Sequence, residues 1–162
     1  MADRVPEMVL RPARAEDCRA LWEWRNDPDT REASFDTEKI PFERHCAWFE
    51  EHLSSPDTRI WIVLGPQGNG IGYVRFQIRG SEAEISAALE PRERGKGYGT
   101  AAIRAAAEKM LSMGPPRRLT ALVKKSNGGS RRSFERAGFQ MAGTRTVAGT
   151  EAWELVCAGE QG

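Results

Sequence analysis

Apolar and polar residues alternate along the middle of the chain. Across residues 71–79, Val74, Phe76 and Ile78 alternate with polar side chains, and a similar alternation returns over residues 83–89. A period of two is that of a β-strand, whose successive side chains point to opposite faces of a sheet. With the β-rich run of residues 59–64 before them, these segments predict a hairpin-linked antiparallel meander of three strands.

Helical spacing occurs on both sides of this meander. In residues 42–53 the apolar positions are four, three and four residues apart, which predicts a helix with one apolar face. Residues 16–26 form an earlier helix that ends before Pro28, because proline disfavours the helical conformation in the residue before it. Residues 100–113 are Ala-rich and residues 127–137 are closed by Gly138, so both are expected to be helical.

Strands at residues 8–13, 118–124, 139–147 and 151–156 complete the order β-α-α-β-β-β-α-β-α-β-β. This is the order of a mixed α/β (α+β) sheet with helices on its faces, not of a regular βαβ repeat. The sequence has no internal repeat or long Pro/Gly/Ser linker. We therefore expect residues 1–162 to form a single domain.

Charge and length exclude several classes of protein. The chain carries 24 Lys and Arg against 23 Asp and Glu, a net charge of +1. This balance gives no general attraction to nucleic acid or to an anionic membrane, so neither is expected as a partner. The first residues contain no apolar stretch of signal-peptide length, and the longest purely apolar run is residues 60–64. A membrane span is therefore not expected either.

The cysteines and histidines indicate no metal centre. Cys18, Cys46 and Cys157 are odd in number and contain no CxxC pair. Such cysteines are typical of reduced thiols, and we expect a cytoplasmic protein. Because His45 and His52 are the only histidines, a multi-histidine metal site is not expected.

A glycine-rich turn at residues 94–102, RGKGYGTAA, separates the predicted meander from the Ala-rich helix. Glycines let the backbone approach a ligand closely, and the helix start supplies free N–H groups and the positive end of the dipole. The basic residues around the turn reinforce this, so we favour a phosphate or pyrophosphate site over a turn that only relieves strain. A dinucleotide site lacks its βαβ context and acidic partner, and a Walker loop lacks its Gly-Lys-Ser/Thr.

Two motifs give the chain a family resemblance. Arg94-x-x-Gly97-x-Gly99 resembles the acetyl-CoA signature Q/R-x-x-G-x-G/A of the GCN5-related N-acetyltransferases, the GNAT family. Residues 127–139, with an Asn, a Ser, a Phe-Glu pair and a final Gly-Phe, are similar to the family's second segment, N-x-x-S/A-x-x-x-Y-E-x-x-G-F. The element order also matches, so the resemblance covers nearly the whole chain. It implies a mostly antiparallel central sheet flanked by about four helices.

The resemblance implies direct transfer of an acetyl group from acetyl-CoA to a primary amine, with acetyl-CoA as cosubstrate and no metal. It implies that the turn wraps the pyrophosphate, that the end of the third meander strand contacts the pantetheine and thioester, and that an asparagine contacts the CoA arm. The cofactor-binding residues expected on this ground are Ala87, Ala88, Leu89, Arg94, Gly95, Lys96, Gly97, Tyr98, Gly99, Thr100 and Asn127.

The catalytic groups are less well defined. Phe134 stands where the family often has a tyrosine that protonates the leaving thiolate, and a phenyl ring cannot donate a proton. Ser130 and Tyr98 are conceivable substitutes, but their spacing supports neither, so no general acid is assigned. Glu84 is the candidate base, because several family members use an acidic residue on this strand. An ordinary glutamate on a polar face is the alternative, and His45 could serve instead.

The N-terminal third resembles a subgroup that acetylates the 4-amino group of nucleotide-linked amino sugars, as in pathways of the pseudaminic-acid type. The similarity is carried by residues 24–28, 34–35 and 45–49, and implies substrate contacts from Arg25, Asn26, Arg31 and His45. An ion-pair set at the helix end is the alternative for the arginines. Alternative acceptors are a protein N-terminus, of the ribosomal-protein type, and a polyamine. A catalytically silent CoA-binding regulatory module is an alternative of another class. The oligomeric state stays open, a homodimer included.

Overall fold

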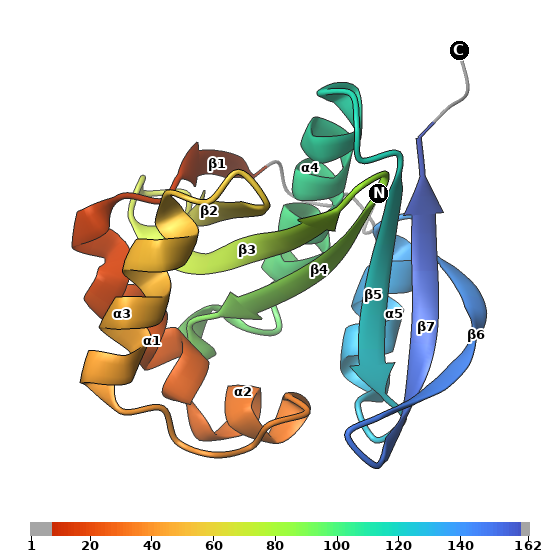
Figure 1. Ribbon diagram of the computed structural model, residues 1–162, viewed down its shortest axis with the longest axis horizontal. Helices are drawn as coiled ribbons and strands as arrows, with labels where there is room; N and C mark the ends of the chain where they lie inside the picture. Colours follow the sequence, from red (N-terminus) through yellow and green to blue (C-terminus); the bar gives the residue numbers. More distant parts are fainter. Residues whose placement is uncertain (1–7, 160–162) are drawn as a thin grey trace.

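The computed structural model describes residues 8–159, in which seven strands form a single sheet in the order β1-β2-β3-β4-β5-β7-β6 (Figure 1). The strands are β1 (Val9–Pro12), β2 (Thr58–Leu64), β3 (Gly70–Arg79), β4 (Glu82–Leu89), β5 (Arg118–Lys124), β6 (Gln140–Val147) and β7 (Thr150–Ala158). The helices are α1 (Cys18–Asn26), α2 (Pro28–Ala33), α3 (Phe42–Leu53), α4 (Tyr98–Ser112) and α5 (Gly128–Arg136). Two single-turn 3-10 helices, Ala15–Asp17 and Pro91–Glu93, precede α1 and α4.

The sheet is antiparallel except at one place. The meander β2-β3-β4 and the hairpin β6-β7 are formed as the sequence predicts. Between them β4 and β5 are parallel and pair over only three residues each, Glu82–Glu84 with 118–120. Beyond Glu84 the two strands diverge, and Figure 1 shows the opening between them. The mixed, mostly antiparallel fold class expected from the sequence is therefore confirmed.

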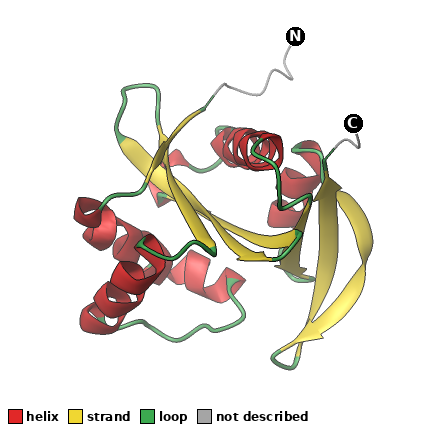
Figure 2. Ribbon diagram, turned by 45° about the horizontal axis from the view of Figure 1, so that its top comes forward, coloured by secondary structure: helices red, strands yellow, loops and turns green. Residues whose placement is uncertain are grey.

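The helices cover both faces of the sheet (Figure 2). Helices α4 and α5 pack on one face over a core that includes Phe76, Met110 and Leu155. Helices α1 and α3 cover the other face of the meander through Leu21 and Phe49. Alternate residues of β2 and β3 contribute to the two cores, as the period of two requires.

Helix α2 was not expected from the sequence, which predicts about four helices where residues 8–159 contain five α-helices. The helix over 16–26 does end before Pro28, but Pro28 then occupies the first turn of a new helix, a position where its missing N–H costs nothing. Asp27 caps α2 by accepting a hydrogen bond from the Thr30 N–H at 3.2 Å. Helix α2 was not expected because proline ends one helix but can also begin the next.

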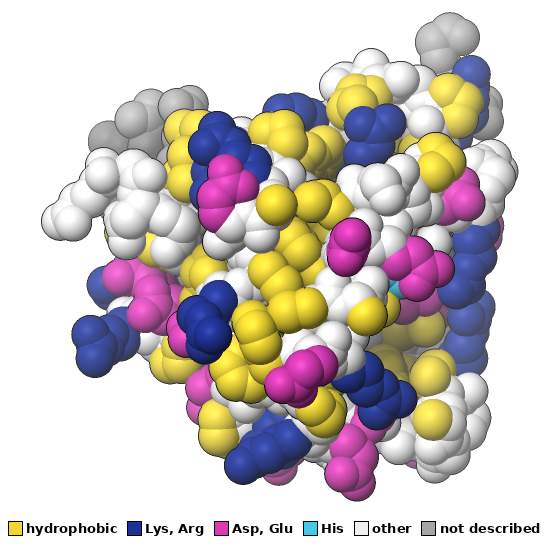
Figure 3. All heavy atoms as spheres, turned by 60° about the vertical axis from the view of Figure 1, so that its left-hand side comes forward, with side chains coloured by type: hydrophobic (Ala, Val, Ile, Leu, Met, Phe, Trp, Pro, Cys, Tyr) yellow, Lys and Arg dark blue, Asp and Glu magenta, His cyan; other side chains and the backbone are white. Residues whose placement is uncertain are grey.

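The surface is consistent with the small net charge. On the side of the molecule that carries α1 and α3, basic and acidic side chains are interspersed around apolar groups (Figure 3). Within residues 8–159, each helix is too short or too polar to cross a membrane. Cys18, Cys46 and Cys157 are free thiols.

Candidate active site

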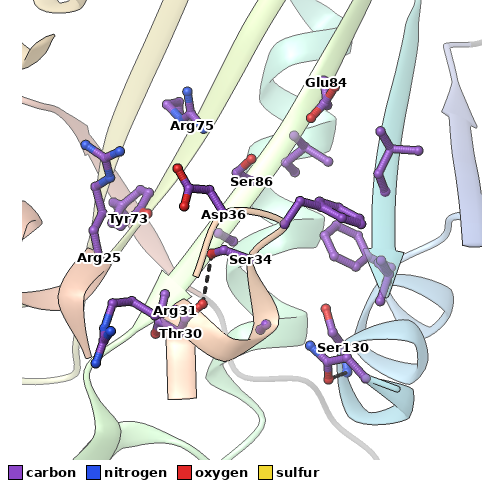
Figure 4. A pocket seen from close by; sticks show the side chains of 18 of the residues that line it. Arg25, Thr30, Arg31, Ser34, Asp36, Tyr73, Arg75, Glu84, Ser86 and Ser130 are labelled. Carbon is purple, nitrogen blue, oxygen red and sulfur yellow. Dashed lines mark hydrogen bonds between the residues drawn. The ribbon is translucent and has the colours of Figure 1, made fainter. Parts of the chain in front are cut away.

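The divergence of β4 and β5 opens a cavity of about 380 Å³ on the side covered by α1 and α2 (Figure 4). Its walls come from α1, from α2 and the loop after it, from β3 and β4, and from β5 with the start of α5. Once two strands part, the backbone groups on their facing edges lose their sheet partners. The cavity therefore offers both side chains and unpaired backbone donors and acceptors to a ligand.

Glu84 lies where the strands part. It is the last residue of β4 that pairs with β5, opposite Thr120, and it faces Gln77 of β3 on its other side. Its half-buried side chain lines the cavity together with Ser86, two residues further along the same face. A carboxylate at this place can accept a proton from a group bound in the cavity.

The glycine-rich turn follows the 3-10 helix Pro91–Glu93 after β4 and ends at α4. Gly95 and Gly97 have φ angles of 78° and 83°, in the left-handed region that glycine adopts without a steric penalty. The first backbone hydrogen bond of α4 runs from Ala101 N–H to Gly97 O at 3.2 Å. The N–H groups of the three residues before Ala101 therefore have no intrahelical acceptor and remain available to an anion.

Two basic side chains of the turn are already paired with acids. The Arg94 guanidinium donates to Asp27 at 2.9 Å, to Thr30 Oγ1 at 3.0 Å and to the Leu89 carbonyl at 3.0 Å. Lys96 Nζ lies 3.2 Å from Glu93. Arg94 thus ties the end of β4 to α2, so its side chain holds the fold and the backbone of the turn is left for the ligand.

Helix α5 starts at the opposite wall of the cavity. Asn127 caps it, with Oδ1 accepting from the Ser130 N–H at 3.1 Å, and both residues line the cavity. Phe134 lies one turn further along α5, packs edge-on against Phe139 with ring centroids 5.2 Å apart, and also lines the cavity. Of the two hydroxyls that could replace the family tyrosine, Ser130 therefore reaches the cavity; Tyr98 packs against the core at the start of α4.

The residues expected to contact the acceptor fall into two groups. Arg25 and Arg31 line the cavity. Asn26 and His45 lie behind its wall. The Asn26 side chain donates to Trp22 O and Ile40 O and accepts from Ile40 N–H, which fixes the loop after α2 to α1.

His45 of α3 is fully buried against α1. The expected direct contact between His45 and a substrate is therefore not possible in this structure. Its Nε2 lies 2.9 Å from Cys18 O, and its Nδ1 lies 2.9 Å from Arg25 Nη1. A carbonyl only accepts, so Nε2 carries the hydrogen and Nδ1 accepts from Arg25. Burial, together with the Arg25 charge, lowers the pKa of His45 and keeps the ring neutral.

Sequence reasoning missed Tyr73, Arg75 and Asp36, which also line the cavity. The first two share a face of β3 with Gln77, and their alternation was visible in the sequence. Their approach to Arg25 was not, since it depends on how α1 packs on the sheet. Asp36 lies in the loop between α2 and α3, a segment with no repeating pattern. Within residues 8–159 there is no cluster of three or more metal-ligating side chains.

The fold is thus a mixed α/β sheet that splays between β4 and β5, with a glycine-capped helix α4 after β4 and the Glu84 carboxylate where the strands part. A family model described as "Acetyltransferase (GNAT) domain" matches residues 7–140, which is most of the chain. The protein therefore belongs to the GNAT family, and it is an acetyl-CoA-dependent N-acetyltransferase. No curated protein matches the chain.

Solved structures confirm the fold at low sequence identity. AAC(6')-Ib in complex with paromomycin and acetyl-CoA is 21% identical, with a TM-score of 0.83 and 94% of each chain covered. The same enzyme with coenzyme A and kanamycin is 22% identical, with a TM-score of 0.82, covering 94% of this chain and 95% of that one. Spermidine N-acetyltransferase from Vibrio cholerae with CoA and spermine is 18% identical, with a TM-score of 0.83 and the same two coverages.

Proposed function

We propose that the cavity holds a small primary amine and that acetyl-CoA lies along the exposed edge of β4 with its pyrophosphate at the glycine-rich turn. The observation that carries this proposal is the early end of the β4–β5 ladder at Glu84, which leaves the last residues of β4 unpaired with β5 on the strand that leads to the turn. The edge of β4 beyond Glu84 can pair with the amide groups of the pantetheine. The free N–H groups at the start of the 15-residue helix α4 suit a diphosphate.

The transfer needs few groups from the protein. The amine nitrogen attacks the acetyl carbon, the carbon–sulfur bond breaks, and CoA leaves as a thiolate. Glu84 accepts the amine proton, directly or through water, and the backbone N–H groups of β4 stabilise the negative charge that develops on the acetyl oxygen. Ser130, which lines the cavity, and solvent are the proposed proton sources for the leaving thiolate, since Phe134 has no proton to give.

We propose a nucleotide-linked amino sugar as the acceptor. Two observations support it: the likeness of residues 24–49 to the subgroup acting on such sugars, and three arginines on the cavity wall, Arg25, Arg31 and Arg75. The neighbours of known structure bind aminoglycosides or spermine, which are polycations. A polyamine acceptor is the alternative, since three carboxylates, Asp36, Glu38 and Glu84, also line the cavity.

The test is release of CoA from acetyl-CoA in the presence of a panel of amines: a nucleotide-linked amino sugar, an aminoglycoside, spermidine and an N-terminal peptide. We expect turnover with the sugar nucleotide. Turnover confined to another amine would overturn the proposal that the acceptor is a nucleotide-linked amino sugar. Thermal stabilisation by acetyl-CoA without turnover on any amine would favour a CoA-binding regulatory module.

A further inference from the structure

Two arginine side chains from different elements meet on one side of the cavity. Arg25 of α1 and Arg75 of β3 both line it, and both lie against the indole ring of Trp48 of α3. Their guanidinium carbons are 4.2 and 5.3 Å from the ring centroid. Figure 4 shows the two arginines beside Tyr73, away from Ser130.

Neither arginine forms an ion pair within residues 8–159, although the carboxylate of Asp36 lines the same cavity (Figure 4). Within the same range, the one side-chain hydrogen bond of the pair runs from Arg25 to His45. A guanidinium carries five N–H donors, so most donors of the pair are unused. Burial, together with the like charge of Arg75, lowers the pKa of Arg25 despite the opposing effect of Tyr73. Two neighbouring cations in a partly buried site favour an anion between them.

Arg25 is held in place from behind. The Cys18 carbonyl accepts from His45 Nε2, and His45 Nδ1 accepts from Arg25 Nη1, each at 2.9 Å. These two consecutive hydrogen bonds use one donor of Arg25 on the side away from the cavity and fix the plane of the guanidinium. A fixed plane reduces the entropy lost when a ligand binds.

Tyr73 adds a neutral donor. Its side chain is 6% exposed and reaches the cavity, and no hydrogen bond to its hydroxyl is found among the described residues. Burial raises the pKa of Tyr73, so the hydroxyl keeps its proton and can donate to an oxyanion.

From this arrangement we infer that Arg25, Arg75 and Tyr73 form a subsite for a carboxylate or phosphate carried by the acceptor. The inference rests on the proposed function and assigns the residues that bind the anionic part of the acceptor: the acceptor is an amine that also bears an anionic group, not a polycation. Arginine pairs recognise carboxylates and phosphates through bidentate hydrogen bonds. The cavity carboxylates Asp36, Glu38 and Glu84 form no ion pair with the two arginines, which leaves them free to attract the amine.

The test uses two matched pairs of amines on the protein saturated with CoA. Glucosamine 6-phosphate is compared with glucosamine, and 6-aminohexanoate with 6-aminohexanamide, by calorimetry. We expect the anionic member of at least one pair to bind about tenfold more tightly, the size expected for charge-assisted hydrogen bonds. The pair that shows the larger difference identifies phosphate or carboxylate as the group. Spermine is the opposite probe and is expected to bind more weakly than either anionic amine.

Variants separate the subsite from a general charge effect. Arg75→Gln should abolish the advantage of the anionic member, and Tyr73→Phe should reduce it while keeping the aromatic ring. Arg79→Gln is the matched control, because Arg79 is an exposed arginine at the end of the same strand and outside this cavity. Equal binding within both pairs, tighter binding of spermine, or an advantage that survives in Arg75→Gln would overturn the inference. Acetyl-CoA affinity, measured by calorimetry on CoA-free samples of the same proteins, tests the proposed function separately.

Discussion

Among single residues, Glu84 is the proposed general base of the acetyl transfer. It is the last residue of β4 that pairs with β5, and its side chain lines the cavity that opens beyond that point. We expect Glu84→Gln to lower kcat about 100-fold or more at neutral pH, the range for loss of a general base, with acetyl-CoA affinity unchanged.

Glu82→Gln is the control for this variant, since Glu82 lies on the same strand and face but outside the cavity, in an exposed ion pair with Arg118. Steady-state kinetics on both variants give the answer. If Glu84→Gln turns over as fast as Glu82→Gln, Glu84 is an ordinary glutamate of a polar face.

His45 is a positioning residue, because it touches Arg25 and not the cavity. In His45→Leu the Arg25 guanidinium loses its fixed partner and the Cys18 carbonyl loses its donor. We expect a higher KM for the acceptor with kcat nearly unchanged, and a stability loss of about 1–3 kcal/mol because the partly buried Arg25 guanidinium loses its hydrogen-bond acceptor. A purely structural role would lower stability and leave the acceptor KM unchanged, which the kinetic measurement detects.

At the scale of elements, α2 is attached to the end of β4 through Asp27 and Arg94. Burial alone would raise the pKa of Asp27, but hydrogen bonds from Arg94 and from the Thr30 N–H outweigh it and hold that pKa below its usual value. A lowered folded-state pKa means that ionised Asp27 stabilises the fold. This stabilisation is present above the unfolded-state pKa of about 3.9 and is lost as the pH falls through the lower folded-state pKa.

Asp27→Asn keeps a helix-capping side chain and removes the charge. We expect it to reduce the free energy of unfolding by about 1 kcal/mol at pH 7, between the values for a surface ion pair and a buried charged hydrogen bond. The difference from wild type should shrink steadily below pH 4 in urea titrations. Asp29→Asn is the control, because Asp29 is 81% exposed and 3.4 Å from the same arginine. An equal loss of unfolding free energy in both variants, or a loss that does not change with pH, would contradict a stabilising contact between Asp27 and Arg94.

The elements themselves were largely predictable from the sequence. Helix α3 and strand β5 have the predicted bounds, because each has a clear period and a definite stop. The divergence of β4 and β5 was not predictable, since alternation shows that a segment is a strand but not which strand it pairs with or for how long. The same holds for the meeting of Arg25 and Arg75, which depends on the packing of α1 over β3.

At the scale of the whole molecule, the sequence motifs, the fold and the family all agree on acetyl transfer. The turn at residues 94–99 lies between the end of β4 and α4, and the cap of α5 at Asn127 lines the cavity after the end of β5, although more than 25 residues separate the two segments in the chain. A single sheet that splays once can therefore present the donor along one edge and the acceptor across one face. The acceptor depends on side chains from distant segments, which is why the sequence alone left several alternatives open.

The central claim is that the glycine turn binds the diphosphate of acetyl-CoA, and calorimetry of acetyl-CoA binding tests it most directly. Gly97→Trp is compared with Gly68→Trp, because the two glycines have nearly equal φ angles of 83° and 82° and Gly68 lies in the β2–β3 turn, outside the proposed site. Thermal unfolding shows whether both variants remain folded. The account predicts that wild type and Gly68→Trp bind acetyl-CoA and that folded Gly97→Trp does not; equal binding by the two variants would contradict it.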